Sequence, residues 1–367
     1  MKTLTSALFI LCYWSTFAQT DSFVVDGTPR SFNVHLPAGY SAANAYPLIL
    51  NLHGYTSNAS DQESYSRMDA VADTAKFIVV YPNGLFVSGQ RYWNAYGVGA
   101  DDVKFLSQLI DSMERRYHVD PSMVYSCGLS NGGYMSYTLA CELENRLAAV
   151  AAVAATISQH TRNNCLLERK MPVLDIHGTA DPIVNYTTGA ANTLGVEATV
   201  AFWRDTNDCS IPGDTVNVPN TNTGDLCSAQ RIHYPNCSAP AEVLFFKITN
   251  GGHTWPGGLI DIPAFGNTCR DFNASIEIWN FFKKHKRTTV GIENAPVLPF
   301  QVWPNPSQGE VQVQFEDRPL PLSLYDIHGR LLWQKTDPQL RELISIKHLD
   351  RGLYILKAGN AEKRIVY

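Results

Sequence analysis

Short apolar runs alternate with amphipathic segments between about residues 31 and 287. Runs of this length, bounded by turn-forming residues, predict buried strands. We expect strands at 31–36, 47–53, 77–81, 123–128, 148–154, 173–177 and 242–248. Strands that alternate with helices are typical of α/β proteins, so the pattern predicts a mostly parallel sheet.

Three segments between or after these runs have helical spacing. The segment 101–117 carries apolar residues three and four positions apart, 131–143 directly follows the fourth strand, and 276–284 is amphipathic. Side chains at that spacing share one face of a helix. We expect such helices to cover both faces of the sheet.

The composition changes near residue 287. Thr, Gly, Asn and Pro accumulate over 288–299, which predicts a linker. Beyond it, short alternating runs separated by turns, among them Val311 to Phe315 and Leu353 to Leu356, predict strands. The expected organisation is a large α/β domain over 19–287 and a small all-β sandwich over 300–367.

The N-terminus has the pattern of a secretory signal. Lys2 precedes an apolar stretch from Leu4 to Trp14, and small residues before Gln19 suit a cleavage site. A first buried strand is the alternative, and the large Leu11 before Cys12 disfavours a lipoprotein. We therefore expect residues 1–18 to be removed and the protein to be secreted or to lie at the cell surface.

Charge excludes one class of partner. The formal net charge is −5, and the only basic tract is the short one from Lys283 to Arg287. Nucleic-acid binding draws most of its affinity from extended basic patches. We expect no nucleic-acid partner, and we expect a monomer.

Eight cysteines become seven after removal of the signal, which fits an oxidising compartment and leaves one thiol unpaired. Cys127 is the candidate for that thiol because it lies in an apolar strand. The disulfide candidates are Cys141, Cys165, Cys209 and Cys237, with Cys227 and Cys269 left over. Sequence alone does not give their connectivity. We expect no metal site, since Cys and His lack zinc spacing, and no cofactor.

The segment Gly128-Leu129-Ser130-Asn131-Gly132 carries the clearest chemical signal. It follows an apolar strand and precedes a helical pattern, and its serine lies between two glycines. This is the nucleophile-elbow pattern, in which a tight strand-to-helix turn presents the serine hydroxyl. The pattern predicts acyl transfer with Ser130 as the nucleophile.

A serine nucleophile needs a base, and the base needs an acid to orient it. Asp181 follows the strand 173–177, and His253 follows the strand 242–248 in a glycine-rich loop. This gives the order Ser, Asp, His expected on such a sheet. Asp175 and His177 are rivals, but both lie within an apolar run, so we interpret them as structural. An Asx turn at Asp181 and a surface position for His253 are the alternatives.

The oxyanion requires two preorganised N–H donors. Asn131 supplies one through its backbone, because it follows the nucleophile at the helix start. The second is expected from the turn His53-Gly54-Tyr55-Thr56 after the strand 47–53, with Tyr55 preferred and Thr56 as the alternative. An ordinary strand-ending turn is the competing interpretation of that segment.

These residues resemble the extracellular esterase family of polyhydroxybutyrate depolymerases, feruloyl esterases and acetylxylan esterases, which has the α/β-hydrolase fold. The resemblance spans about residues 23–282. Its motifs are Leu52-His53-Gly54, Trp93-Asn94, Asp101-Asp102-Val103, Gly128 to Gly133, His177 to Asp181 and Gly252 to Gly257. The resemblance implies the triad Ser130, Asp181 and His253, and it also implies a Cys209–Cys237 bridge.

The C-terminal block resembles a type IX secretion sorting domain. Its motifs are Trp303 to Pro306 with Gly309, the Asp326 to Gly329 turn, Gly352 to Ile355 and the basic ending Lys363 to Val366. The resemblance implies export across the outer membrane by the type IX machinery. A polysaccharide-binding or adhesive module is the alternative.

The substrate is less closely defined. Trp93, Trp255 and Thr56 are candidate substrate contacts, although burial in the core is the alternative for both tryptophans. The segment 209–237 is expected either to cover the cleft or to form a solvated excursion. We expect a feruloyl or acetyl esterase acting on plant cell-wall polysaccharide. The alternatives are a depolymerase of polyhydroxybutyrate or another polyester, a peptidase and a non-catalytic binder.

Overall fold

The computed structural model describes residues 19–239, 241–287, 300–315, 319–358 and 361–367. The chain divides into an N-terminal unit, Met1–Thr288, and a C-terminal unit, Thr289–Tyr367. The expected signal peptide and the expected linker, 288–299, lie outside the described residues. Within the described part of the chain, no helix has the length and apolar character needed to cross a bilayer.

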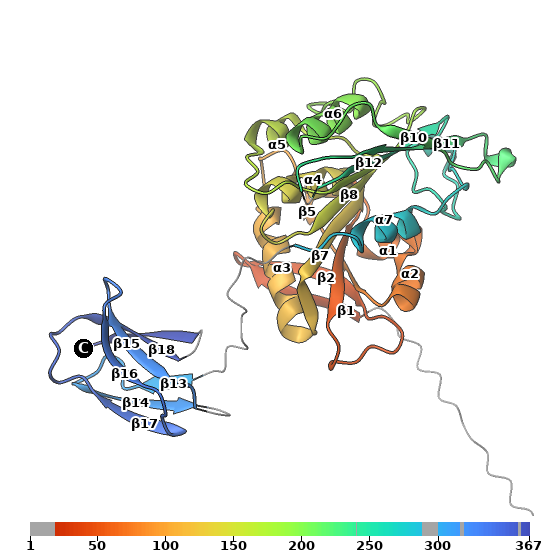
Figure 1. Cartoon of the computed structure of the whole chain (residues 1–367). Coiled ribbons are helices and arrows are strands. Elements are labelled where there is room, and N and C mark those ends of the chain that lie inside the picture. The colour runs from red at the N-terminus through yellow and green to blue at the C-terminus, as the bar shows by residue number, and fades with distance from the viewer. Residues whose placement is uncertain (1–18, 240, 288–299, 316–318, 359–360) are drawn as a thin grey trace, which may run out of the picture. The chain divides into compact units, whose positions relative to one another are not determined.

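The N-terminal unit is built on one ten-stranded sheet (Figure 1). In spatial order its strands are β1 (Gln19–Val25), β2 (Thr28–His35), β4 (Ile78–Pro82), β3 (Tyr46–Leu52), β7 (Val119–Leu129), β8 (Ala149–Val153), β9 (Val173–Gly178), β12 (Val243–Thr249), β11 (Ser228–Tyr234) and β10 (Asp214–Asn217). The strands from β4 to β12 run parallel, and antiparallel pairs extend both edges. The predicted, mostly parallel sheet is confirmed.

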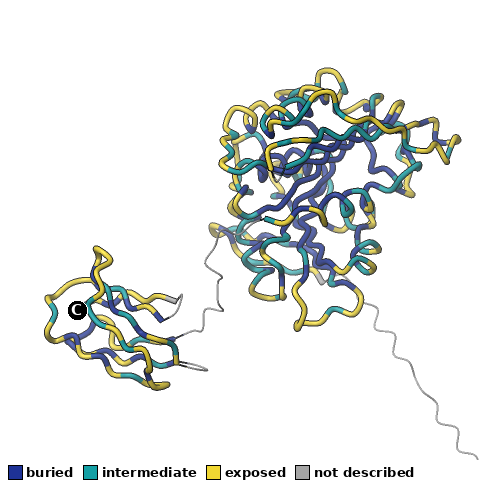
Figure 2. The backbone as a smooth tube through the Cα atoms, in the orientation of Figure 1, coloured by how far each residue is buried: buried dark blue, intermediate teal, exposed yellow. Residues whose placement is uncertain are grey.

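Helices cover both faces of this sheet. They are α1 (Ala59–Ser66), α2 (Met68–Ala75), α3 (Asp102–Arg116), α4 (Asn131–Glu142), α5 (Gln159–Asn164), α6 (Val196–Thr206) and α7 (Ala274–Phe282), with short 3-10 turns η1 (Thr223–Asp225) and η2 (Pro263–Phe265). Helices α3, α4 and α6 pack into one apolar cluster with the sheet, and α1, α2 and α7 pack into another. Figure 2 shows the strands between them as a continuous buried band. This double layer is the predicted arrangement.

The pattern of apolar residues did not predict the helices and strands that bury the least apolar surface. All four residues of β10 are exposed, and α1 has too few apolar residues to show a helical stripe. The hairpin of β5 (Leu85–Val87) and β6 (Gln90–Tyr92) is only three residues on each side. The segment 209–237 forms β10, η1 and β11, so it extends the sheet edge, which corrects the expectation of a cleft cover or a solvated excursion.

Two of the expected disulfides are present. Cys141 bonds to Cys165, and Cys209 bonds to Cys237. Three cysteines of the described chain, Cys127, Cys227 and Cys269, are buried free thiols, so the expectation of a single unpaired thiol is wrong. Cys127 lies in β7, where burial raises its pKa well above the usual range. The protonated thiol is a poor nucleophile, so the interpretation of Cys127 as an inert core residue agrees with its surroundings.

The C-terminal unit contains two antiparallel sheets around a separate apolar core. One sheet has β13 (Phe300–Trp303), β14 (Glu310–Phe315) and β17 (Arg341–Ser345); the other has β16 (Leu331–Lys335), β15 (Leu322–Asp326), β18 (Leu353–Ala358) and β19 (Ala361–Val366). Buried and exposed residues alternate along β14 and β15, which places one face of each strand on the core. This agrees with the predicted small all-β fold.

Ser130 occupies the sharp turn between β7 and α4. Its φ of 53° and ψ of −119° are unfavourable for an L-residue. The turn is held from both sides, because the Ser130 N–H donates to the Val153 carbonyl at 2.8 Å and β3 lies against the flanking glycines. A Cβ on Gly132 would lie 2.2 Å from the Leu52 carbonyl oxygen, and one on Gly128 would lie 2.7 Å from the same atom. Only glycine therefore allows this approach.

Replacing Gly132 tests that constraint. We expect Gly132→Ala to lower the free energy of unfolding by about 2–3 kcal/mol, since the added methyl meets rigid backbone. Gly224→Ala is the matched control, because its new Cβ would make only an ordinary contact 3.5 Å from Asn222. Urea unfolding followed by tryptophan fluorescence measures both. Equal stability of the two variants would contradict the packing argument.

Candidate active site

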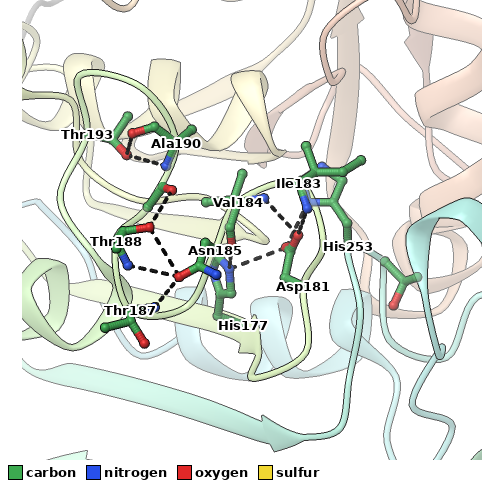
Figure 3. Close-up of polar contacts among 12 residues, drawn as sticks. His177, Asp181, Ile183, Val184, Asn185, Thr187, Thr188, Ala190, Thr193 and His253 are labelled. Carbon is green, nitrogen blue, oxygen red and sulfur yellow. Dashed lines mark hydrogen bonds and ion pairs between the residues drawn. The ribbon is translucent and has the colours of Figure 1, made fainter.

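Asp181 and His253 meet at the carboxyl ends of β9 and β12. His253 Nδ1 lies 2.8 Å from Asp181 Oδ2, and Asp181 Oδ1 accepts the N–H groups of Ile183 and Val184 at 2.8 Å each (Figure 3). Burial raises the pKa of Asp181, but hydrogen bonds and charge from His177 and His253 outweigh it, so the pKa lies well below its usual value. With Nδ1 bonded to an ionised acid, the Nε2 atom of His253 is left to act as a base.

A cavity of about 560 Å³ brings Ser130 and His253 to one surface. Its other lining residues come from the turn after β3, from α1, from the end of β7, from the turn after β9 and from the loop after His253: Gly54, Tyr55, Thr56, Ser57, Asp61, Gln62, Ser64, Tyr65, Leu129, Ile183, Ile260, Ile262 and Phe265. The predicted nucleophile and base thus line one cavity, and the predicted acid is bonded to the base; the three residues follow β7, β9 and β12, with β8 between the first two strands. This arrangement suits proton removal from a serine hydroxyl by His253.

Asn131, whose backbone N–H is one predicted oxyanion donor, is held in place by hydrogen bonds of its side chain to the Trp93 backbone. Asn131 Oδ1 accepts the Trp93 N–H at 2.6 Å, and Asn131 Nδ2 donates to the Trp93 carbonyl at 3.0 Å. The Asn131 N–H lies in the first turn of α4, where the helix supplies no acceptor. The Thr56 N–H donates to the Arg91 carbonyl at 2.8 Å, which disfavours the alternative donor. Tyr55 remains the predicted second donor.

His53 secures the turn that carries Tyr55. Its Nδ1 lies 2.7 Å from the Gly54 carbonyl, and its Nε2 accepts the Gly84 N–H at 2.9 Å. The ring is therefore neutral, with its hydrogen on Nδ1. Burial lowers the pKa of His53 to about 4, partly offset by the Gly54 bond, with a further lowering by the charge of Arg91.

One predicted substrate contact, Trp255, requires correction. Trp255 is 1% exposed and donates through Nε1 to Ser275 Oγ at 3.1 Å, in the core between the sheet and α7. Trp93 also has no exposed surface, and its Nε1 donates to the His53 carbonyl at 3.0 Å, but the residue is among those that line a second cavity beside Ser130. Trp93 therefore stays a predicted contact. Thr56 is exposed and lines the cavity, so it remains a candidate contact.

The interpretation of His177 as merely structural missed its closeness to the acid. His177 Nε2 lies 3.3 Å from Asp181 Oδ2, so two imidazoles approach one carboxylate from different sides (Figure 3). Asp175 lies two residues earlier on β9 and accepts the Tyr137 hydroxyl at 2.5 Å. Two polar residues at alternate positions of an apolar strand were the available signal.

One further acidic cluster lies outside this site. Ligand-type atoms of Asp225, Cys269 and Asp271 lie within 4.8 Å of one another. Asp225 already accepts the backbone N–H groups of Cys227 and Arg270, and Asp271 accepts two more. These bonds stabilise the loops themselves, and they account for the cluster.

The pH dependence of stability tests the His53 assignment. His53 has a lower pKa folded, about 4, than unfolded, about 6.5, so the unfolded chain takes up its proton first as pH falls. Because of this difference in the pKa of His53, we expect the free energy of unfolding to fall by about 3 kcal/mol between pH 6.5 and pH 4. His53→Gln should flatten that part of the profile, whereas His118→Gln, at an exposed histidine, should keep it. An unchanged slope in His53→Gln would show that another group causes it.

Comparison with known proteins places both units. The C-terminal unit matches the family described as "Secretion system C-terminal sorting domain" over residues 301–367. This confirms the predicted sorting domain, and it indicates a protein exported to the cell surface or beyond. The match favours the sorting domain over the alternative of a polysaccharide-binding or adhesive module.

Relatives of the N-terminal unit are esterases. A bifunctional acetylxylan esterase/xylanase from Neocallimastix patriciarum is 29% identical over 62% of this chain and 31% of its own length. Feruloyl esterase B from Piromyces equi is 29% identical over 61% of this chain and 42% of its own length. The chain thus matches less than half of either relative.

The fold also has a counterpart among solved structures. The acetyl xylan esterase from Aspergillus awamori superposes with a TM-score of 0.53 at 14% identity, covering 72% of this chain and 99% of that chain. At this identity the likeness concerns the fold alone. Residues 25–255 match the family described as "Putative esterase", so the chain belongs to that esterase family.

Proposed function

We propose that this protein is a serine carboxylic-ester hydrolase that works through an acyl-enzyme. The observation that carries the proposal is the buried Asp181–His253 hydrogen bond of 2.8 Å beside a cavity that Ser130 also lines. Membership of the esterase family supports it. Because all three residues come from one unit of one chain, we propose a monomer as the active form.

The geometry supports a two-step reaction. His253 Nε2 takes the Ser130 proton as the hydroxyl oxygen attacks the ester carbonyl, and Asp181 stabilises the imidazolium through Nδ1. The N–H groups of Tyr55 and Asn131 hold the oxyanion. His253 then gives the proton to the leaving alcohol, and water releases the acyl group by the reverse sequence. No cofactor enters these steps.

Two cavities meet at Ser130, and the chemistry assigns a role to each. The first contains His253, which must protonate the leaving alcohol, so the alcohol portion belongs there. A second cavity of about 570 Å³ contains Asn131 instead of His253. With the carbonyl oxygen held by Tyr55 and Asn131, the acyl group points into this second cavity.

The acyl cavity favours an aromatic acid over acetate. Four tyrosines line it, in two ring pairs with centroids 6.1 Å apart: Tyr55 with Tyr92, and Tyr96 with Tyr134. An acetyl group would leave most of this volume empty, whereas a feruloyl group offers a flat ring to the tyrosines. We therefore propose a feruloyl ester of plant cell-wall polysaccharide as substrate.

A polyester is the second candidate substrate, because exposed apolar side chains lie at the alcohol cavity. Ile183 and Ile260, which line the alcohol cavity, are 46% and 54% exposed, and the neighbouring Leu259 is 68% exposed. Large apolar side chains gathered in this way often mark a binding surface. A polyhydroxybutyrate or aromatic polyester chain would suit that surface.

We also propose how the chain is organised for export. Residues 1–18 form a removed signal peptide, 19–287 the esterase domain, 288–299 a linker and 300–367 the sorting domain. The division of the chain near residue 288 and the family match over 301–367 support these limits. The type IX machinery is the proposed partner of the sorting domain.

Covalent labelling tests the nucleophile. We expect a fluorophosphonate to add one adduct to Ser130, located by peptide mass spectrometry, and none to Ser130→Ala. That variant should lose at least about 10⁴-fold in kcat for a feruloyl ester, because nothing replaces the nucleophile. Ser122→Ala, at the opposite end of β7, is the control and should keep full activity. Labelling of wild type elsewhere, or hydrolysis by Ser130→Ala, would refute the assignment.

Acyl selectivity tests the cavity assignment. We expect Tyr96→Leu to lower kcat/KM for methyl ferulate by about tenfold, through the loss of roughly 1.4 kcal/mol of ring contact, while methyl acetate hydrolysis stays unchanged. Ile260→Ser, in the alcohol cavity, is the matched comparison and should leave the ferulate-to-acetate ratio unaltered. Soluble products from a polyester film, without ferulate release, would favour the polyester instead.

A further inference from the structure

His177 contacts the proposed acid from the interior side. The residue is 1% exposed, and its Nε2 atom lies 3.3 Å from Asp181 Oδ2 and 3.1 Å from the Val184 carbonyl (Figure 3). Both neighbours are acceptors, so Nε2 must carry a hydrogen; it hydrogen-bonds to the Val184 carbonyl and forms an ion pair with Asp181. Asp181 therefore receives three hydrogen bonds, two from backbone N–H groups on Oδ1 and one from His253 on Oδ2, and His177 adds an ion pair at Oδ2.

A second buried carboxylate, Asp175, lies on the same strand as His177, and its charge acts on the imidazole. Asp175 and His177 are two residues apart on β9, so their side chains lie on one face of the strand. Asp175 Oδ2 accepts the Tyr137 hydroxyl from α4 at 2.5 Å. Asp175 Oδ1 and His177 Nδ1 have no hydrogen-bond partner among the described residues. The charges of two acids thus act on His177.

The surrounding charges favour a protonated imidazole. Burial lowers the pKa of His177, but the Asp181 bond and the charges of Asp175 and Asp181 outweigh it and raise the pKa. Burial raises the pKa of Asp175 to about 7, partly offset by His177 and Tyr137.

The remaining groups near this pair come from other elements. The Tyr186 ring meets His177 edge-on at 6.2 Å, and Glu197 of α6 adds a more distant negative charge that is paired with Lys247 at 2.9 Å. Neither group displaces Asp181 as the acceptor nearest to His177 Nε2.

We propose that His177 is a positioning residue for ester hydrolysis: its Nε2–H holds the Asp181 carboxylate toward His253, and its charge, shared with Asp175, keeps that carboxylate ionised. The proposal rests on the proposed function, in which Asp181 orients the base. His177 touches no reacting atom, since it lies behind Asp181 and outside both cavities at Ser130.

This arrangement has a measurable consequence for proton transfer. The positive charge of His177 lies beside Asp181 Oδ2, and it disfavours a further positive charge at the proposed catalytic pair. Without His177, the protonated and inactive form of the site is favoured, and the acid limb of the activity profile should move upward.

Two substitutions separate the hydrogen bond from the charge. We expect His177→Ala to lower kcat for methyl ferulate by about 10- to 100-fold with little change in KM, because Asp181 loses its orientation. The acid limb of kcat/KM should rise by about half a pH unit or more. His177→Gln keeps an N–H donor without the charge, so kcat should return to within about fivefold of wild type while the limb stays raised. His118→Gln, at an exposed histidine, should match wild type in both.

Fluorophosphonate titration and thermal unfolding accompany each assay, so that rates refer to folded sites. Wild-type kcat and an unmoved acid limb in His177→Ala would overturn the proposal, as would equal losses in His177→Ala and His177→Gln. If His177→Ala does not fold, His177→Gln decides by itself, and an unmoved limb there overturns the proposal. A wild-type protein that takes no label and cleaves no ester would instead refute the proposed function.

Discussion

The buried carboxylate of Asp181 is the interaction on which the site depends. A charge removed from water is tolerated only when hydrogen bonds replace its solvation. Three hydrogen bonds and the His177 ion pair do so here, and they come from the strand end of β9, from the turn that follows it and from the loop after β12. Holding that one group ionised therefore fixes three separate segments of chain relative to one another.

Close packing of backbone segments determines the position of the nucleophile. The Ser130 turn exists because β3 can lie against Gly128 and Gly132 at distances that leave no room for a side chain. That contact also places the end of β3, and with it Tyr55, beside the start of α4. Trp93 then links the two segments, because its backbone bonds to the Asn131 side chain and its indole N–H donates to the His53 carbonyl. The proposed oxyanion site is thus a product of backbone packing more than of any side chain.

Much of the architecture could be predicted from local pattern. The central strands are apolar enough to stand out, and α3 shows its stripe of buried residues clearly. Edge strands such as β10 could not be found this way, because an exposed edge buries nothing and leaves no apolar signature. The prediction of a substrate contact at Trp255 was wrong for a related reason. An indole has both an apolar ring and an N–H, so its residue type does not say whether Trp93 or Trp255 faces a cleft or the core.

The sequence by itself determined the fold class, the sorting domain and the order of Ser130, Asp181 and His253, because periodicity, turn chemistry and motif spacing are local properties of the chain. Only the tertiary structure decided which neighbours each group meets. It placed His177 on the far side of Asp181, engaged the Thr56 N–H with Arg91 and divided the space around Ser130 into two cavities. These facts depend on contacts between strands and loops distant in sequence, and no single segment carries that information.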